Sequence, residues 1–124
     1  MKATDLMIGD WVLYAGEDKR LKNKPVQVTG ICMEIMQGSF SKEMYEVLSY
    51  GKIKPIPIDE DILEKNGWKA GAGESIRFKS PYILAKKNDV WTMHYNEARI
   101  AEIRYVHELQ NTMRITGYQG WFKV

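Results

Sequence analysis

The pair His107-Glu108 is the first place where the sequence suggests enzyme chemistry. In the zinc-protease motif His-Glu-x-x-His, two histidines one helical turn apart hold the metal, and the glutamate activates water. Here Asn111, a poor zinc ligand, stands at the second histidine position, and His94 is the only other histidine of the chain. The pattern is therefore typical of a structural helix, and we expect no bound zinc.

The other groups that support catalysis are not spaced for it. None of the serines has the Gly-x-Ser-x-Gly flanks of a nucleophile elbow. Acidic pairs such as Asp59 with Asp61 and Glu60 with Glu64 suit the start of a helix, where carboxylates stabilise the unpaired N–H groups. We therefore predict a protein that is not an enzyme, with no catalytic residues, no cofactor and no metal site.

Basic residues in the first long loop, at positions 15–25, are the candidates for nucleic-acid binding. Small barrels bind nucleic acid by combining basic loops, which neutralise phosphates, with exposed aromatics, which stack on bases. Trp11 and Tyr14 precede the loop, but they are equally good core residues, and Glu17 and Asp18 lie among the cations. Nucleic-acid binding is therefore an alternative hypothesis, and its residues are Lys19, Arg20, Lys22 and Lys24.

The composition is that of a globular domain, with 124 residues, 44% hydrophobic and 11% aromatic. The net charge is only +2, and the basic excess is spread along the chain, which excludes a dedicated nucleic-acid arm. Cys32 is the only cysteine, so an intramolecular disulfide and a cysteine-based zinc site are excluded. Its apolar neighbours predict that the Cys32 side chain is buried.

The chain has neither the apolar core of a secretion signal at its start nor an uninterrupted apolar stretch of membrane-spanning length. A soluble, cytoplasmic protein without a membrane partner is the expectation.

The first 58 residues predict short strands separated by turns. Strand character is found at 11–14 and again from 26 to 35, and alternation at 45–47 predicts another strand. Turns are predicted at 37–39 and 50–52, and Pro55 and Pro57 indicate an extended edge segment. This pattern favours a small SH3-like β-barrel over residues 1–58.

Residues 59–124 predict a second, mixed region. Asp59 is expected to cap a short linking helix that ends at Asn66-Gly67, and 69–73 is expected to form a loop. Period-two alternation from Glu74 predicts an antiparallel β-meander with a hairpin turn at 86–89 and a last strand at 98–104. Residues 120–124 are interpreted as a closing strand or an aromatic tail.

The segment 105–117 predicts one amphipathic helix, ended by Gly117. Its apolar stripe must lie on a sheet, because one short helix is marginal alone in water. The stripe contains Val106, Leu109 and Met113, and we expect the polar residues of the other arc to be exposed or half-buried: His107, Glu108, Asn111 and Arg114.

Three segments resemble small proteins common in Bacteroides-type bacteria and in their phages and mobile elements. They are Lys-Ala-Thr-Asp-Leu-Met-Ile-Gly-Asp-Trp-Val at 2–12, Ile-Lys-Pro-Ile-Pro-Ile-Asp-Glu-Asp-Ile-Leu-Glu-Lys-Asn-Gly-Trp at 53–68, and Ile-Arg-Tyr-Val-His-Glu-Leu-Gln-Asn at 103–111. The chain departs from the family pattern at 112–114 and carries Asp59 where the family has threonine. The family has no assigned activity, so the resemblance implies a common origin and one fold.

Together these patterns predict an α+β protein. An SH3-like barrel at 1–58 is followed at 59–124 by a linking helix and an antiparallel β-meander packed by one C-terminal helix, and the two parts are expected to form one compact unit. We expect a non-catalytic accessory or interaction protein of phage or mobile-element origin that acts through a protein partner. Strand edges near Pro55 and the Trp121-Phe122 tail are the expected contacts, and weak nucleic-acid binding by 19–24 is the alternative.

Overall fold

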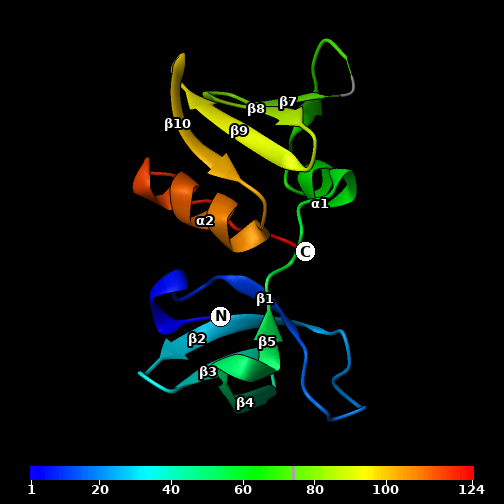
Figure 1. Cartoon of the computed structure of the whole chain (residues 1–124), viewed down its shortest axis with the longest axis vertical. Helices are drawn as coiled ribbons and strands as arrows, with labels where there is room; N and C mark the ends of the chain where they lie inside the picture. The colour runs from blue at the N-terminus through cyan, green and yellow to red at the C-terminus, as the bar shows by residue number, and fades with distance from the viewer. Residues whose placement is uncertain (74) are drawn as a thin grey trace. The chain divides into compact units, whose positions relative to one another are not determined.

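The computed structural model describes residues 1–73 and 75–124 and shows an α+β protein with two antiparallel sheets (Figure 1). The chain folds as two compact units, the N-terminal unit Met1–Ile56 and the C-terminal unit Pro57–Val124. The sequence places the division two residues later, after Ile58. The expectation that the two parts form one compact unit stays a prediction.

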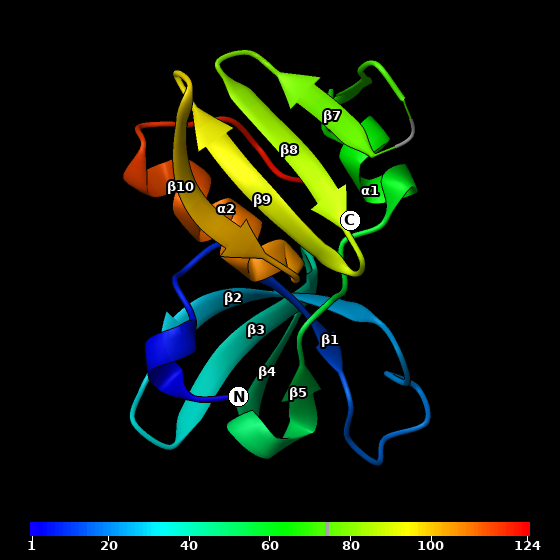
Figure 2. The ribbon, with the colours of Figure 1, turned by 45° about the horizontal axis from the view of Figure 1, so that its top comes forward.

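The N-terminal unit is a curled sheet of five antiparallel strands in the order β4-β3-β2-β1-β5 (Figure 2). Short 3₁₀ helices precede the first strand and connect β4 to β5. The elements are η1 Ala3–Asp5, β1 Trp11–Tyr14, β2 Pro25–Ile31, β3 Ile35–Ser41, β4 Met44–Ser49, η2 Tyr50–Lys52 and β5 Ile53–Lys54.

Gly38 lies inside β3, so the turn predicted at 37–39 is wrong. A Cβ atom at this position would collide with Cγ2 of Val26 and lie 3.1 Å from Cε of Met36. Val26 and Met36 are both buried in the core of this unit. Glycine is therefore placed here by close packing against core side chains, and its presence does not mark a turn.

The strand predicted to continue through Met33 ends at Ile31, and residues 32–34 form the turn between β2 and β3. Cys32 is consequently exposed, and the prediction of a buried thiol is wrong. Tyr50 holds this turn in place: its hydroxyl donates a hydrogen bond to the carbonyl of Cys32 at 2.5 Å and lies 3.1 Å from the carbonyl of Ile35. Apolar neighbours in sequence did not indicate burial here because the chain reverses at this point.

The C-terminal unit contains a five-stranded antiparallel meander in the order β10-β9-β8-β7-β6, with α2 lying across one face (Figure 1). The segment 69–73 was predicted as a loop, but its first two residues pair with β7. Glu74, where the alternation was predicted to resume, lies outside the described residues. The elements are α1 Glu60–Lys65, β6 Lys69–Ala70, β7 Ile76–Lys79, β8 Tyr82–Lys87, β9 Val90–Tyr95, β10 Ala98–Ile103 and α2 Val106–Ile115.

Helix α1 begins and ends as its sequence predicts. The Asp59 carboxylate accepts a hydrogen bond from the N–H of Ile62 at 2.8 Å, which satisfies a donor of the first turn. At the other end Gly67 has φ +83°, and the N–H of Trp68 donates to the carbonyl of Leu63 at 3.0 Å. This is a Schellman ending, and it turns the Trp68 ring into the core of the unit.

Helix α2 repeats this ending. Gly117 has φ +94°, and the N–H of Tyr118 donates to the carbonyl of Met113 at 2.9 Å. At the start of the helix the carboxylate of Glu108 accepts from the N–H of Tyr105 at 3.0 Å. At both ends of α2, backbone groups that a helix leaves unpaired are therefore hydrogen-bonded.

Tyr82 joins the two helix ends to the sheet. Its ring centroid lies 6.3 Å from that of Trp68, 6.4 Å from that of Tyr118 and 5.3 Å from that of Tyr95. Its hydroxyl shares a hydrogen bond of 2.6 Å with Oγ1 of Thr116. The aromatic residue that follows each helix thus packs on the same strand residue.

The C-terminal tail is an irregular segment fixed to α1. The amide group of Asn66 donates to the carbonyls of Ile62 at 2.8 Å and Lys123 at 2.7 Å, and its oxygen accepts from the N–H of Lys123 at 2.8 Å. Phe122 packs against the core, whereas Trp121 is 88% exposed. Of the two interpretations of residues 120–124, the aromatic tail is confirmed, because these residues form no strand.

Candidate interaction face of the N-terminal sheet

Four side chains form a row across the solvent face of the N-terminal sheet. The register pairs Trp11 with Gln27, Gln27 with Ser39, and Ser39 with Tyr45. Residues directly opposite each other in an antiparallel sheet project from the same face. Their neighbours in sequence project into the core, so this set, hereafter the outer row, faces solvent; the buried neighbours include Val12, Val26, Val28 and Gly38.

A shallow hollow of about 330 Å³ follows the outer row. Its lining combines aromatic rings, neutral polar groups and one cation, and no carboxylate belongs to it in this fully described unit. Tyr45 is 54% exposed at one end, and Trp11 is half-buried at the other. The lining residues are Trp11, Gln27, Thr29, Ser39, Phe40, Ser41, Lys42 and Tyr45.

The polar pair in the middle of the row is oriented by local hydrogen bonds. Nε2 of Gln27 donates to the carbonyl of Gly9 at 3.2 Å, and Oγ of Ser39 donates to the carbonyl of Ser41 at 2.8 Å. With these donors used, the side-chain oxygens of Gln27 and Ser39 keep lone pairs for incoming donors. The hollow thus offers stacking surfaces at its ends and hydrogen-bond acceptors between them.

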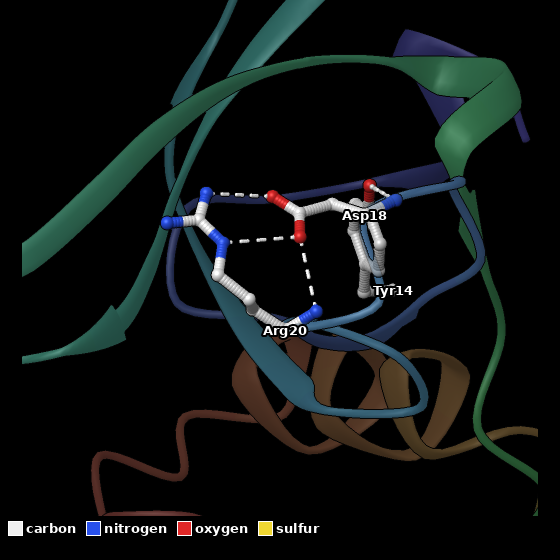
Figure 3. A network of polar contacts seen from close by, with 3 residues as sticks. All are labelled: Tyr14, Asp18 and Arg20. Atoms are coloured by element: carbon white, nitrogen blue, oxygen red, sulfur yellow. Dashed lines mark hydrogen bonds and ion pairs between the residues drawn. The ribbon is translucent and has the colours of Figure 1, made fainter.

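The loop 15–24 next to this face is organised around Asp18 (Figure 3). Arg20 forms an ion pair with Asp18, with Nη2 at 2.8 Å from Oδ2, and its Nε and backbone N–H both donate to Oδ1. These bonds from Arg20 hold the pKa of the Asp18 carboxyl below its usual 3.8. The N–H of Asp18 in turn donates to the hydroxyl of Tyr14 at 3.1 Å.

The structure separates the residues that the sequence grouped as a nucleic-acid site. Tyr14 is buried in the core and offers no stacking surface, and the charge of Arg20 is compensated by Asp18. Leu21 is also buried and anchors the loop. Lys19, Lys22 and Lys24 remain exposed, and the antiparallel order places their loop at the same end of the sheet as Lys42.

The His-Glu-x-x-Asn motif has structural roles in α2. His107 is 7% exposed and its ring stacks on Tyr105 at 6.0 Å between centroids, so the expectation that His107 is exposed or half-buried is wrong. The buried arc of the helix is wider than its apolar stripe and includes Gln110. Glu108 caps the helix, and Oδ1 of Asn111 accepts from Arg114 at 3.0 Å.

Within residues 1–73 and 75–124, no group of three or more histidine, cysteine or acidic side chains could hold a metal ion. His94 projects from the face of β9 opposite to the one that α2 covers, as its pairing with Ile83 shows. A hollow of about 510 Å³ beside α1 contains both charge signs, and there Glu60 forms an ion pair with Arg77 at 3.1 Å. Because these charges already satisfy each other, the outer row is the stronger candidate site.

Sequence reasoning singled out Trp11 but missed the rest of the outer row. The alternation of Gln27 and Thr29 with Val26 and Val28 does indicate one polar and one apolar face. It does not indicate which residues of β3 and β4 lie beside them, because this depends on strand register. The sequence therefore contained a signal for two of the four residues of the outer row, Trp11 and Gln27.

Comparison of the chain with family models, with curated proteins and with solved structures gave no match. Among the described helices, none is long and apolar enough to cross a membrane.

Proposed function

We propose that this chain is a non-catalytic interaction protein whose N-terminal unit binds an extended segment of a partner protein along the outer row. The observation that carries the proposal is the arrangement of Trp11 and Tyr45 at the two ends of a polar pair, on the solvent face of a sheet whose other face is the core. Origin in a phage or mobile element, and action in the cytoplasm, are proposed from the sequence patterns and the resemblance.

We also propose that the N-terminal unit is an SH3-like barrel. In support of this, β5 returns to pair with β1, so the last strand lies beside the first in the order β4-β3-β2-β1-β5. A long loop joins the first two strands, and the 3₁₀ helix η2 joins the last two. Such a return leaves β4 and β5 as the two edge strands of a curled sheet, the arrangement of a partly closed barrel.

An extended peptide suits the chemistry of the hollow. Proline-rich peptides dock on aromatic-lined grooves in a preformed extended conformation, at about 3.1 Å per residue. Three strand spacings of about 4.8 Å separate Trp11 from Tyr45, so about five peptide residues span the row. The side-chain oxygens of Gln27 and Ser39 can accept hydrogen bonds from peptide N–H groups, and Lys42 attracts a carboxylate of the peptide.

Nucleic-acid binding is the second candidate, favoured by the exposed Lys19, Lys22 and Lys24 at the same end as Lys42. The same end also carries the exposed carboxylates of Glu17 and Glu43, which offset part of this charge. Phosphate binding releases counterions and must weaken steeply with salt, whereas docking on aromatics does not.

The test measures binding of fluorescent decapeptides to the full chain by anisotropy. One peptide alternates proline with aspartate, one alternates proline with lysine, and a single-stranded ten-nucleotide DNA is measured at two salt concentrations. We expect the acidic peptide to bind best. Tyr45→Ala should weaken its binding by about tenfold or more, as loss of an aromatic anchor does.

Val47→Ala is the matched control for Tyr45→Ala. Val47 lies on the same strand two residues on, is 61% exposed and does not line the hollow, so its truncation should leave binding unchanged. Equal effects of the two changes would contradict the proposal. Salt-sensitive DNA binding that is lost when Lys19, Arg20, Lys22 and Lys24 become serine, with no peptide binding, would favour the nucleic-acid alternative instead.

A further inference from the structure

Figure 2 shows α2 along one face of the C-terminal sheet, and the register places a second row of paired side chains on the opposite face. The register pairs Lys69 with Phe78, Phe78 with Ile83, Ile83 with His94 and His94 with Arg99. These five residues, hereafter the distal row, therefore project from one face across all five strands. The residues that alternate with them on β8 and β9 belong to the buried core, among them Tyr82, Leu84 and Met93.

The centre of the distal row is apolar and open. Phe78 is 40% exposed and Ile83 is 44% exposed. The next row on the same face continues this surface with Ile76 and Ala85, which are half-buried. A solvated face of an antiparallel sheet normally carries polar side chains, so neighbouring exposed phenylalanine and isoleucine side chains indicate a contact surface.

The edges of the same face are cationic. Lys69 and Arg99 stand at its two ends, and Lys87 lies on the same face at the end of β8. The carboxylate of Glu102 contacts Arg99 at 2.7 Å, but both side chains are more than half exposed, so the pair is weak. Of the six basic residues on the strands of this unit, Lys69, Lys87 and Arg99 lie on this face, and the one acidic strand residue, Glu102, lies there as well.

We propose that the distal row is a docking surface for an acidic amphipathic helix of a partner protein. The apolar centre occupies β7 and β8 and ends at His94 on β9, a width of about 10 Å at the usual strand spacing. A helix is about 10–12 Å wide and fits this width when it lies along the strands. Its apolar stripe then covers Phe78 and Ile83, and its carboxylates lie toward Lys69 on one side and Arg99 on the other.

Other occupants fit this face less well. A second copy would bring the same cationic edges near each other, and like charges across an interface oppose association. Single-stranded nucleic acid requires successive aromatic platforms, and among the described residues of the distal row Phe78 is the one phenylalanine, tyrosine or tryptophan. The acidic helix satisfies both the charge and the apolar centre, and it is independent of peptide binding by the N-terminal unit.

The test uses the full chain and a labelled 18-residue helical peptide of leucine, alanine and glutamate, with leucines at i, i+3, i+4 and i+7. A matched peptide carries lysine in place of every glutamate. Anisotropy should show saturable binding of the glutamate peptide alone. Ile83→Ser should weaken this binding by about tenfold or more, whereas Ile115→Ser, at an 81% exposed position on α2, should leave it unchanged.

Charge reversal gives the sharper result. The double variant Lys69→Glu/Arg99→Glu should lose the glutamate peptide and gain the lysine peptide, and because both positions are exposed its urea unfolding curve should match that of the wild type. Binding of both peptides alike, or of neither, would overturn the proposal. A dimer seen by sedimentation and dissociated by Ile83→Ser would also overturn it, because the face would then bind a second copy. DNA binding that the charge reversal abolishes would overturn it as well.

Discussion

Gln27 on β2 and Ser39 on β3 lie directly opposite each other on the solvent face of the N-terminal sheet, between Trp11 and Tyr45. Each side chain donates a hydrogen bond to a nearby backbone carbonyl, which fixes its orientation before any ligand arrives. Preorganised groups lose little conformational entropy on binding. The pair therefore makes the outer row a ready-made site for backbone donors of an extended chain.

Gly16 should tolerate no side chain. A Cβ atom there would collide with the hydroxyl and ring of Tyr14, which is a buried core residue. We expect Gly16→Ala to lower the free energy of unfolding by about 1–3 kcal/mol, the usual cost of overpacking. Gly51→Ala is the control, because no atom lies within 4 Å of its added Cβ. Urea unfolding that shows the same stability for both variants would contradict this packing.

The Asp18 carboxyl should titrate at lower pH than an ordinary aspartate. Its pKa is held below 3.8 chiefly by the side-chain hydrogen bond from Arg20. A lowered folded pKa means that its stabilising effect is complete above pH 3.8 and is lost as the pH falls through the folded pKa. NMR titration of the carboxyl carbon should show this, and Arg20→Gln should raise the pKa toward 3.8. An unchanged pKa in Arg20→Gln would show that the ion pair is not formed in solution.

The Asn66 side chain should contribute more to holding the C-terminal tail in place than is usual for an asparagine. Replacing it with alanine removes three hydrogen bonds, a buried one to the carbonyl of Ile62 and two part-buried ones to the backbone of Lys123. The cost should be about 1–3 kcal/mol. Amide exchange at Lys123 should accelerate strongly in Asn66→Ala and stay slow in Asn111→Ala, whose side chain bonds only a half-buried arginine. Slow exchange in both variants would show that the tail is held by other contacts.

The faces of α2 can be compared by three truncations. Leu109→Ala should cost about 2–5 kcal/mol, because Leu109 is fully buried in the core of the C-terminal unit. His107→Ala should cost about 1–3 kcal/mol, since His107 is buried and stacked on Tyr105. Asn111→Ala should cost less than about 1 kcal/mol. Urea unfolding at equal protein concentration ranks the three losses of stability. If His107→Ala cost no more than Asn111→Ala, His107 would lie at the surface.

The sequence predicted best where local chemistry decides the structure. Asp59 caps α1, and the pairs Asn66-Gly67 and Thr116-Gly117 end the two helices, because a capping carboxylate and a glycine with positive φ are local requirements. The hairpin turn between β8 and β9 was found for the same reason, since Asn88 accepts a φ of 58°. These features need no knowledge of tertiary contacts.

The features that sequence reasoning missed depend on distant neighbours. The pattern around Gly38 predicts a turn because Val26, whose side chain leaves no room for a Cβ atom at Gly38, lies on β2 and reaches this position only after folding. The polarity of His107 predicts an exposed or half-buried side chain, and its burial is not encoded in that polarity. The outer row itself requires the register of four strands, which alternation within a single strand does not give.

The most direct test of the outer row follows the indole N–H signals of the chain by ¹H–¹⁵N NMR during titration with the proline–aspartate decapeptide. Trp11 lines the hollow and Trp121, exposed in the C-terminal unit, does not, so the two signals serve as probe and control. The signal absent from the Trp11→Phe spectrum should move saturably while that of Trp121 stays in place. A peptide that binds while the Trp11 signal remains still would contradict the assignment of this face.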